Sequence, residues 1–186
     1  MKRMQTFAAA LAVVGLIVAA PFVARATPPL GISFTPVGRA TVPAFDVRRT
    51  FRVQTGDDVD GRDEDGDKER KSWKLQLEAT APIDVATQVV TFPAGGNSGW
   101  HTHPGPVFFT VRTGTLTVYE GDDPTCTPLV FTAGMGAVEA GTSRHIHMVR
   151  NETRDLAEAV VTYMVPVGTP QKELRTDLPN PGNCPF

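Results

Sequence analysis

The four histidines of this chain lie in two short clusters of the same form, His101-Thr-His103 and His145-Ile-His147. On a β-strand, residues i and i+2 point to the same face, so each cluster can present two imidazoles on one side of a strand. Two such strands could meet around one metal ion, and histidine is the commonest protein metal ligand. We therefore take His101, His103, His147 and His145 as candidate metal ligands. The alternative is that either pair is only a polar strand edge.

The N-terminal region has the composition of a secretory signal peptide. A basic start, Lys2-Arg3, is followed by an almost wholly apolar stretch over residues 7–23 and by the small-x-small sequence Ala24-Arg25-Ala26. An uncleaved membrane anchor is the alternative, but the stretch is slightly shorter than the roughly 20 residues of a spanning helix, and Pro21 interrupts its end. We predict cleavage of residues 1–26 and a secreted or periplasmic protein.

The remaining residues, 27–186, have a length that suits one domain with a single core. Loss of Lys2, Arg3 and Arg25 would remove three positive charges and change the formal net charge from −2 to −5. A mildly acidic domain without a basic stripe argues against nucleic acid, or an anionic membrane after signal cleavage, as a partner.

The two cysteines, Cys126 and Cys184, suggest a disulfide, because an even cysteine count in an exported protein usually means pairing. The bond would hold the Pro-rich end of the tail, residues 166–186, against the domain. Metal ligation by the cysteines is the less favoured alternative, since neither has a partner at ligand spacing.

Short runs rich in Val, Thr, Phe and Tyr follow the predicted signal peptide, and Gly, Pro, Asn and Asp separate them. Helix signals are nearly absent, and the spacing is close to the roughly 8–12 residues between strands of a sandwich or barrel. We therefore predict an all-β chain, with strands over residues 47–53, 73–79, 85–92, 107–112, 115–119, 129–132 and 157–165.

Residues 56–71 differ from the rest, with eight acidic and four basic side chains. We interpret them as a solvated acidic loop between two strands. Calcium binding is the less favoured alternative, because the acidic residues do not follow the spacing of an EF-hand loop.

The histidine clusters resemble the two motifs of the cupins, which are double-stranded β-helix (jelly-roll) barrels. The first motif is Gly, five residues, His-x-His, three or four residues, Glu, six residues, Gly. Gly95, His101, His103 and Gly114 match its spacing. The chain looks like the small exported cupins that carry a Trp-His-x-His-Pro-Gly-Pro run and end in Pro-Gly-Asn-Cys-Pro. This resemblance implies a cupin barrel over roughly residues 47–165, but no substrate.

The second motif, Gly, five residues, Pro-x-Gly, two residues, His, three residues, Asn, is matched at its end by Gly141, His147 and Asn151. Two departures affect the site. Val107 stands where the first motif has its glutamate, and Glu139-Ala-Gly141 replaces Pro-x-Gly. The ligand set implied by the resemblance is therefore the three histidines of the two motifs, with His145 as a fourth candidate. Glu139 is either an additional ligand, a partner of the ligands or an exposed strand residue.

A site of three neutral imidazoles suits one divalent transition metal, namely iron, zinc, copper or nickel, better than manganese, which prefers oxygen ligands. Three protein ligands also leave open positions, as catalytic sites require. Aromatic and sulfur side chains near the motifs are candidates for a pocket, although most of them suit a barrel core equally well. They are Phe92, Trp100, Phe108, Phe109, Met135, Met148 and Tyr163.

Three functional hypotheses follow. The first is a metal-dependent enzyme on a small molecule, similar to the dioxygenase cupins. The second is a non-catalytic barrel that binds a metal or a small ligand, and the third is a structural domain. An open metal position beside an apolar cavity would favour the enzyme, whereas four bound histidines without a cavity would favour a structural or storage site. The resemblance also implies a possible homodimer paired through barrel edges.

Overall fold

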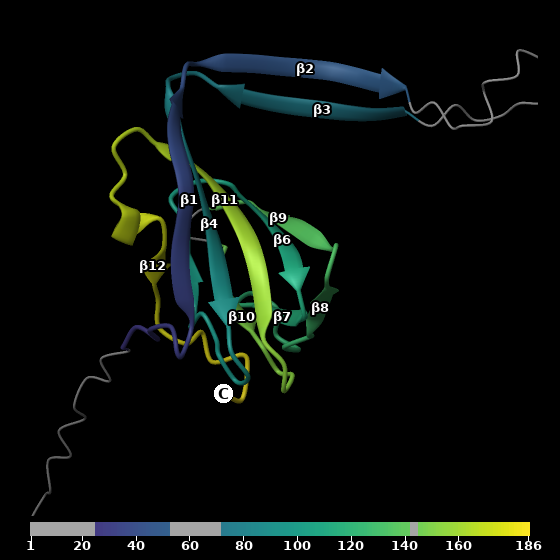
Figure 1. Ribbon diagram of the computed structural model, residues 1–186, viewed down its shortest axis with the longest axis vertical. Coiled ribbons are helices and arrows are strands. Elements are labelled where there is room, and N and C mark those ends of the chain that lie inside the picture. The colour runs from purple at the N-terminus through teal and green to yellow at the C-terminus, as the bar shows by residue number, and fades with distance from the viewer. Residues whose placement is uncertain (1–24, 53–71, 142–144) are drawn as a thin grey trace, which may run out of the picture.

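The computed structural model describes residues 25–52, 72–141 and 145–186. Two five-stranded antiparallel sheets enclose the core (Figure 1). The first sheet contains, in spatial order, β1 (Ser33–Val42), β4 (Ile83–Phe92), β11 (Ala157–Pro166), β6 (Val107–Thr113) and β9 (Gly136–Glu139). The second contains β12 (Thr176–Asp177), β5 (His101–Thr102), β10 (His147–Arg150), β7 (Thr115–Glu120) and β8 (Leu129–Thr132). The predicted all-β jelly-roll architecture, the double-stranded β-helix, is confirmed.

In the central strands of the first sheet, buried and less buried residues alternate, and the buried residues form the inner face of the sheet. Every second residue of β4 is buried, and β11 follows the same pattern over most of its length. Val90 and Phe92 of β4 meet Leu116 and Val118 of β7 in the main hydrophobic cluster. Since β7 belongs to the second sheet, this cluster joins the two sheets.

All seven predicted strands are present, and most of them extend one or two residues beyond the predicted ends. Three further strands, β1, β9 and β12, were not predicted. A short 3-10 helix, η2 (Gln171–Glu173), precedes β12. Residues 1–24 of the predicted signal peptide and the predicted acidic loop, residues 56–71, lie outside the described residues.

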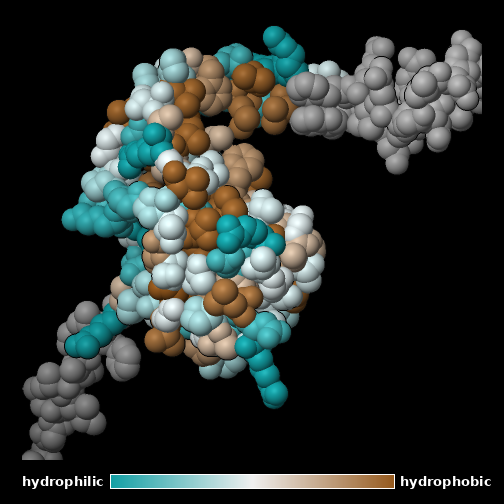
Figure 2. Space-filling view, in the orientation of Figure 1, coloured by the Kyte–Doolittle hydropathy of each residue, from teal (hydrophilic) through white to brown (hydrophobic). Residues whose placement is uncertain are grey.

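An arm of two antiparallel strands, β2 (Phe45–Arg52) and β3 (Ser72–Ala79), continues the β1–β4 hairpin and extends away from the barrel (Figure 1). Phe45, Val47 and Leu77 lie on one face of the arm, because Phe45 pairs with Ala79 and Val47 pairs with Leu77. Figure 2 shows hydrophobic residues on the arm and on the visible face of the barrel.

The predicted disulfide is present between Cys126 and Cys184. Cys184 is buried in a cluster with Trp100, Tyr119 and Met148, which covers the outer side of the second sheet. The disulfide therefore fixes the end of the C-terminal tail to the barrel. In the part of the chain that the structure describes, no helix has the length and hydrophobicity needed to cross a membrane.

Candidate metal centre

A turn at Gly99 precedes His101 and His103. Gly99 has φ +65°, and a Cβ at this position would lie 2.0 Å from the carbonyl oxygen of Thr27. Only glycine fits such a backbone approach at a positive φ. The turn leads into β5, which places the side chain of His101 inside the barrel and that of Trp100 in the cluster beneath the disulfide.

His147 reaches the same point from the neighbouring strand. It is the residue of β10 that pairs directly with His101 of β5, and their ring centroids are 4.3 Å apart. The His103 ring lies 4.8 Å from that of His101 and 5.2 Å from that of His147. One ligand atom from each of the three residues lies within 4.8 Å of the other two. The structure thus brings together three of the four predicted ligands.

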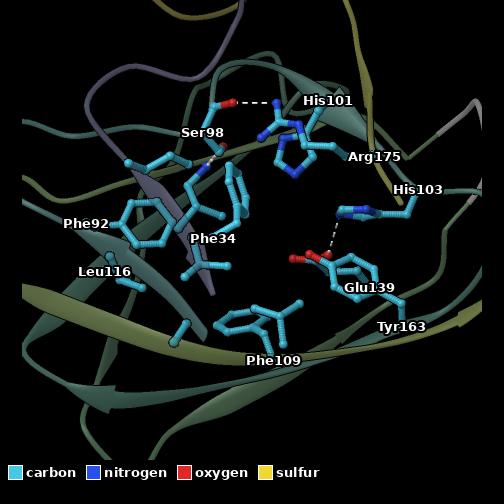
Figure 3. Close-up of a pocket in the computed structure, with 15 residues that line it drawn as sticks. Phe34, Phe92, Ser98, His101, His103, Phe109, Leu116, Glu139, Tyr163 and Arg175 are labelled. Carbon is cyan, nitrogen blue, oxygen red and sulfur yellow. Dashed lines mark hydrogen bonds and ion pairs between the residues drawn. The ribbon is translucent and has the colours of Figure 1, made fainter. Parts of the chain in front are cut away.

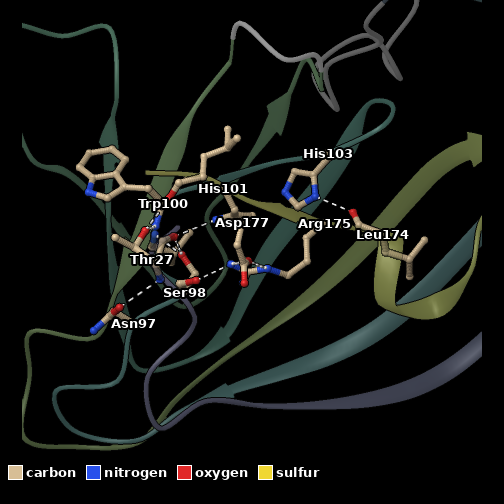
Figure 4. A network of polar contacts seen from close by, with 12 residues as sticks. Thr27, Asn97, Ser98, Trp100, His101, His103, Leu174, Arg175 and Asp177 are labelled. Atoms are coloured by element: carbon tan, nitrogen blue, oxygen red, sulfur yellow. Dashed lines mark hydrogen bonds and ion pairs between the residues drawn. The ribbon is translucent and has the colours of Figure 1, made fainter. Parts of the chain in front are cut away.

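Backbone carbonyls orient two of the three imidazoles. Nδ1 of His101 lies 3.0 Å from the carbonyl oxygen of Gly99, and Nδ1 of His103 lies 2.8 Å from that of Leu174 (Figure 4). Since a carbonyl only accepts hydrogen bonds, each Nδ1 carries the proton and each Nε2 has a free lone pair. This is the tautomer that a metal ligand needs.

A carboxylate completes the cluster from the opposite sheet. Oε2 of Glu139 lies 3.2 Å from Nε2 of His103 (Figure 3) and 3.3 Å from Nε2 of His147. Glu139 on β9 pairs directly with Val107 on β6, so its side chain is next to the position where the cupin motif has glutamate. Of the three alternatives for Glu139, an exposed strand residue is excluded, because its carboxylate is buried beside His103 and His147. The sequence motif could not reveal this, because the carboxylate comes from a different strand.

The electrostatics favour an ionised Glu139 carboxylate and a neutral His101. Burial raises the pKa of Glu139, but His147 and His103 outweigh it and hold this pKa well below its usual value. Burial lowers the pKa of His101, and the positive charges around it, including that of Arg175, act in the same direction. His101 is therefore neutral at neutral pH.

The cluster fits a divalent transition metal. Both ring nitrogens of His147 are buried without a hydrogen-bond partner among the described residues, although Glu139 is near. A buried polar atom without a partner costs about 1–3 kcal/mol, and a metal ion on one ring nitrogen of His147 would remove this cost for that atom. Three imidazole nitrogens and one carboxylate oxygen are a donor set that binds such ions.

His145 lies outside this group. It precedes β10, and its Nδ1 is 3.5 Å from Oε2 of Glu120 at the end of β7. Its ring centroid is 5.1 Å from that of His147, but it contributes no atom to the three-histidine group. We therefore leave His145 out of the ligand set proposed below.

Asn151, the end of the second motif, has a structural role. Its side-chain amide donates to the carbonyl oxygens of Phe92 and Asp155, and its oxygen accepts from Thr153. These bonds hold the turn after β10 against the end of β4. The motif spacing thus identifies both a ligand candidate and a residue that positions its strand.

A cavity of about 40 Å³ lies beside the cluster, between the two sheets (Figure 3). His101, His103 and Glu139 form its polar end together with Tyr163 and Arg175. Of the predicted pocket residues, Phe92, Phe109 and Tyr163 line it. The rest of the apolar wall contains Ile32, Phe34, Val90, Leu116, Val149, Ala159 and Val161. Arg175 and the carbonyl of Leu174 come from the C-terminal tail, where the sequence showed no motif.

Comparison with known proteins identifies the domain. Residues 88–163 match the family model of the Cupin domain. Among solved structures, the chain is similar to oxalate oxidase in complex with the substrate analogue glycolate (26% identity, 42% of this chain, 40% of that chain, TM-score 0.37). It is also similar to an uncharacterized conserved protein with a double-stranded β-helix domain from Klebsiella pneumoniae (18% identity, 50% of this chain, 73% of that chain, TM-score 0.40).

The chain spans 40% of the length of that oxalate oxidase structure. No curated protein matches it. The motif spacing, the two antiparallel sheets and the family match all indicate a cupin domain. Residues 88–163 are therefore a cupin domain in both sequence and fold.

Proposed function

We propose that this protein binds one divalent transition metal and is a metal-dependent enzyme that acts on a small molecule. The observation that carries the proposal is a cavity that is lined by an apolar wall and by two of the three clustered histidines, His101 and His103. A structural metal site would have no reason to adjoin a space of about 40 Å³. That space exceeds the roughly 10–15 Å³ that one water molecule needs, so it has room for part of a small ligand.

The proposed ligands are His101, His103, His147 and Glu139. An ion bound there would act as a Lewis acid towards an oxygen atom of the substrate. The protein's own contribution is orientation. The carbonyls of Gly99 and Leu174 fix two imidazole tautomers, and the apolar wall excludes water from the side of the cavity opposite the histidines.

The carboxylate widens the range of metals that we propose. Iron, zinc, copper and nickel remain candidates, and the oxygen of Glu139 adds manganese, which binds well to oxygen donors. Oxidation of the substrate by dioxygen, as in dioxygenase cupins, is the version of the reaction that we would test first. A non-catalytic ligand-binding barrel is the alternative.

We further propose that the protein works outside the cytoplasm, as its predicted signal peptide indicates. The disulfide between Cys126 and Cys184 supports this location, because such bonds persist mainly in oxidising compartments. Thr27, the residue after the predicted cleavage site, donates a backbone hydrogen bond to Leu178. Cleavage at that site would leave this contact in place.

The first test is metal content. The full chain is produced in an oxidising compartment, and its bound metals are measured by mass spectrometry before and after reconstitution with iron, zinc, copper, nickel and manganese. We expect about one equivalent of metal. The double variant His101→Ala/His147→Ala should lose it, whereas His145→Ala, a histidine removed outside the cluster, should keep it. A wild-type chain that binds no metal would sink the proposal.

The second test is turnover. Oxygen consumption by the loaded protein is followed with a panel of small phenols, thiols, diketones and carboxylates. Consumption that requires both metal and His147 would support the oxidase or dioxygenase version. Metal binding without turnover of any compound would instead favour the non-catalytic barrel.

A further inference from the structure

Arg175 brings a positive charge into the cavity from the C-terminal tail. It lies between η2 and β12, and its side chain is 13% exposed. Its guanidinium lines the cavity together with His101 and Tyr163 (Figure 3). Burying an arginine is costly unless its charge and its donors are used, so this placement needs a reason beyond fold stability.

The guanidinium is only partly satisfied by the protein. Its Nε and Nη2 donate to Oδ1 of Asp177 at 2.8 and 2.5 Å, and Nη2 also donates to the carbonyl oxygen of Ser98 (Figure 4). These bonds use three of the five N–H groups of an arginine. Among the described residues, none accepts a hydrogen bond from Nη1. The two N–H groups of Nη1 therefore remain for a ligand.

Tyr163 offers a further donor on the same cavity. Its hydroxyl oxygen accepts a hydrogen bond of 2.7 Å from Nε2 of Gln88, and no described residue accepts the hydroxyl proton. A phenol has an ordinary pKa of about 10, so the Tyr163 hydroxyl carries a proton at neutral pH and can donate a hydrogen bond to a ligand.

The charges around the cavity call for one negative charge on the ligand. The ion pair of Arg175 with Asp177 is neutral overall, and the imidazoles are neutral as ligands. A divalent ion and the Glu139 carboxylate leave a net charge of +1. A monoanion balances this charge, whereas a neutral molecule leaves it buried without compensation.

We propose that Arg175 determines specificity and that the substrate is a small monocarboxylate with a short apolar chain. Its carboxylate would accept hydrogen bonds from an N–H group of Nη1 and from the Tyr163 hydroxyl, and its apolar part would lie against Phe92 and Phe109. The charge argument rests on the proposed metal site. The argument from free donors does not, so the two proposals can fail separately.

The test compares a carboxylate with its neutral isostere. Butanoate and butanamide are titrated calorimetrically into the full chain, with and without bound metal. We expect the loaded wild-type protein to prefer butanoate by about tenfold or more, as a charge-assisted contact requires. Arg175→Met should reduce this preference to near unity. Arg112→Met, which removes the same charge from the outer surface at Glu158, should keep it.

Asp177→Asn separates recognition from a structural role. Both Arg175→Met and Asp177→Asn weaken the contacts of the tail. Asp177→Asn, however, leaves the guanidinium of Arg175 in place and removes the carboxylate that neutralises its charge. We expect Asp177→Asn to bind butanoate as tightly as the wild type or more tightly. Equal loss of butanoate binding in both variants would overturn the proposal. Equal binding of butanoate and butanamide by the wild type would also overturn it.

Metal content is measured on every sample. Arg175→Met should keep its metal, because Arg175 is not a proposed ligand. If the wild type binds no metal, the proposed function fails, but the titration of the metal-free chain still decides the role of Arg175. A preference for butanoate that disappears in Arg175→Met would then support anion recognition alone, and no preference would overturn it.

Discussion

Val107 and Glu139 are directly paired residues on the adjacent antiparallel strands β6 and β9. Val107 holds the position of the cupin motif's glutamate, and Glu139 supplies the carboxylate from across the pair. Side chains directly opposite each other have Cβ atoms about 4.5–5.5 Å apart on the same face of the sheet. The carboxylate can therefore come from either strand and still reach His103 and His147.

Glu139→Gln tests the carboxylate. The amide has the same shape but no charge, so we expect metal affinity to fall by about 10–100-fold, with manganese affected more than zinc. Competition with a coloured chelator measures this change. The double variant Val107→Glu/Glu139→Val should recover much of the affinity, because it moves the carboxylate to the paired position. If Glu139→Gln binds every metal as tightly as the wild type, Glu139 is not a ligand.

Gly141→Ala tests the backbone contact that holds β9 in this register. Gly141 has φ +58°, and a Cβ there would lie 1.8 Å from the carbonyl oxygen of Gly105. We expect a loss of more than about 1 kcal/mol in the free energy of unfolding, and weaker metal binding, since Glu139 would shift. Urea denaturation and chelator competition measure the two effects. Gly134→Ala is the control: it also has a positive φ, but nothing lies within 4 Å of its added Cβ.

Cys126→Ser/Cys184→Ser tests the attachment of the tail. The disulfide spans a sequence separation of 58 residues. The chain-entropy model assigns to such a loop at most about 4 kcal/mol of stabilisation. We expect the free energy of unfolding to fall by an amount up to this limit. Reduction of the wild-type protein should give the same value, and an unchanged denaturation midpoint would contradict the prediction.

The acid sensitivity of the fold should depend on Asp84. Hydrogen bonds from the Thr41 hydroxyl, the Gly168 amide and Arg39 lower the pKa of Asp84 from 3.8 to about 2. Because the folded state favours the carboxylate, its contribution to stability is complete above pH 3.8 and is lost as the pH falls through about 2. Between these values the stability of the wild type should fall more steeply than that of Asp84→Asn, as urea denaturation at each pH would measure. Parallel curves would show that Asp84 has no such role.

The parts of the fold that the sequence predicted are those with a periodic pattern. β4 and β11 bury every second residue over most of their length, so their apolar residues alternate. β1 was missed because it is an edge strand with nine exposed residues out of ten, and it includes Pro36 and Gly38. Without a buried face, such a strand has no hydrophobic period to detect.

The candidate site also has residues that the sequence predicts and residues that it does not. The three histidines could be predicted because their type and i, i+2 spacing carry the signal. The carbonyl of Leu174 could not, since any residue has one, and it lies 71 positions from His103. Arg175 stands in no motif of the sequence, and only the fold brings it to the cavity. Glu139 was one of several alternatives until the β6–β9 register placed it between His103 and His147.

The dependence of the site on the C-terminal tail sets an order of events during synthesis. A ribosome makes both histidine clusters before it adds Leu174, which orients His103, and Cys184, which secures the tail. The nascent chain therefore carries its candidate metal ligands for some time without their final orientation. If the proposed metal site is correct, high-affinity loading requires the docked tail, so chains that end before Leu174 would be poor competitors for metal.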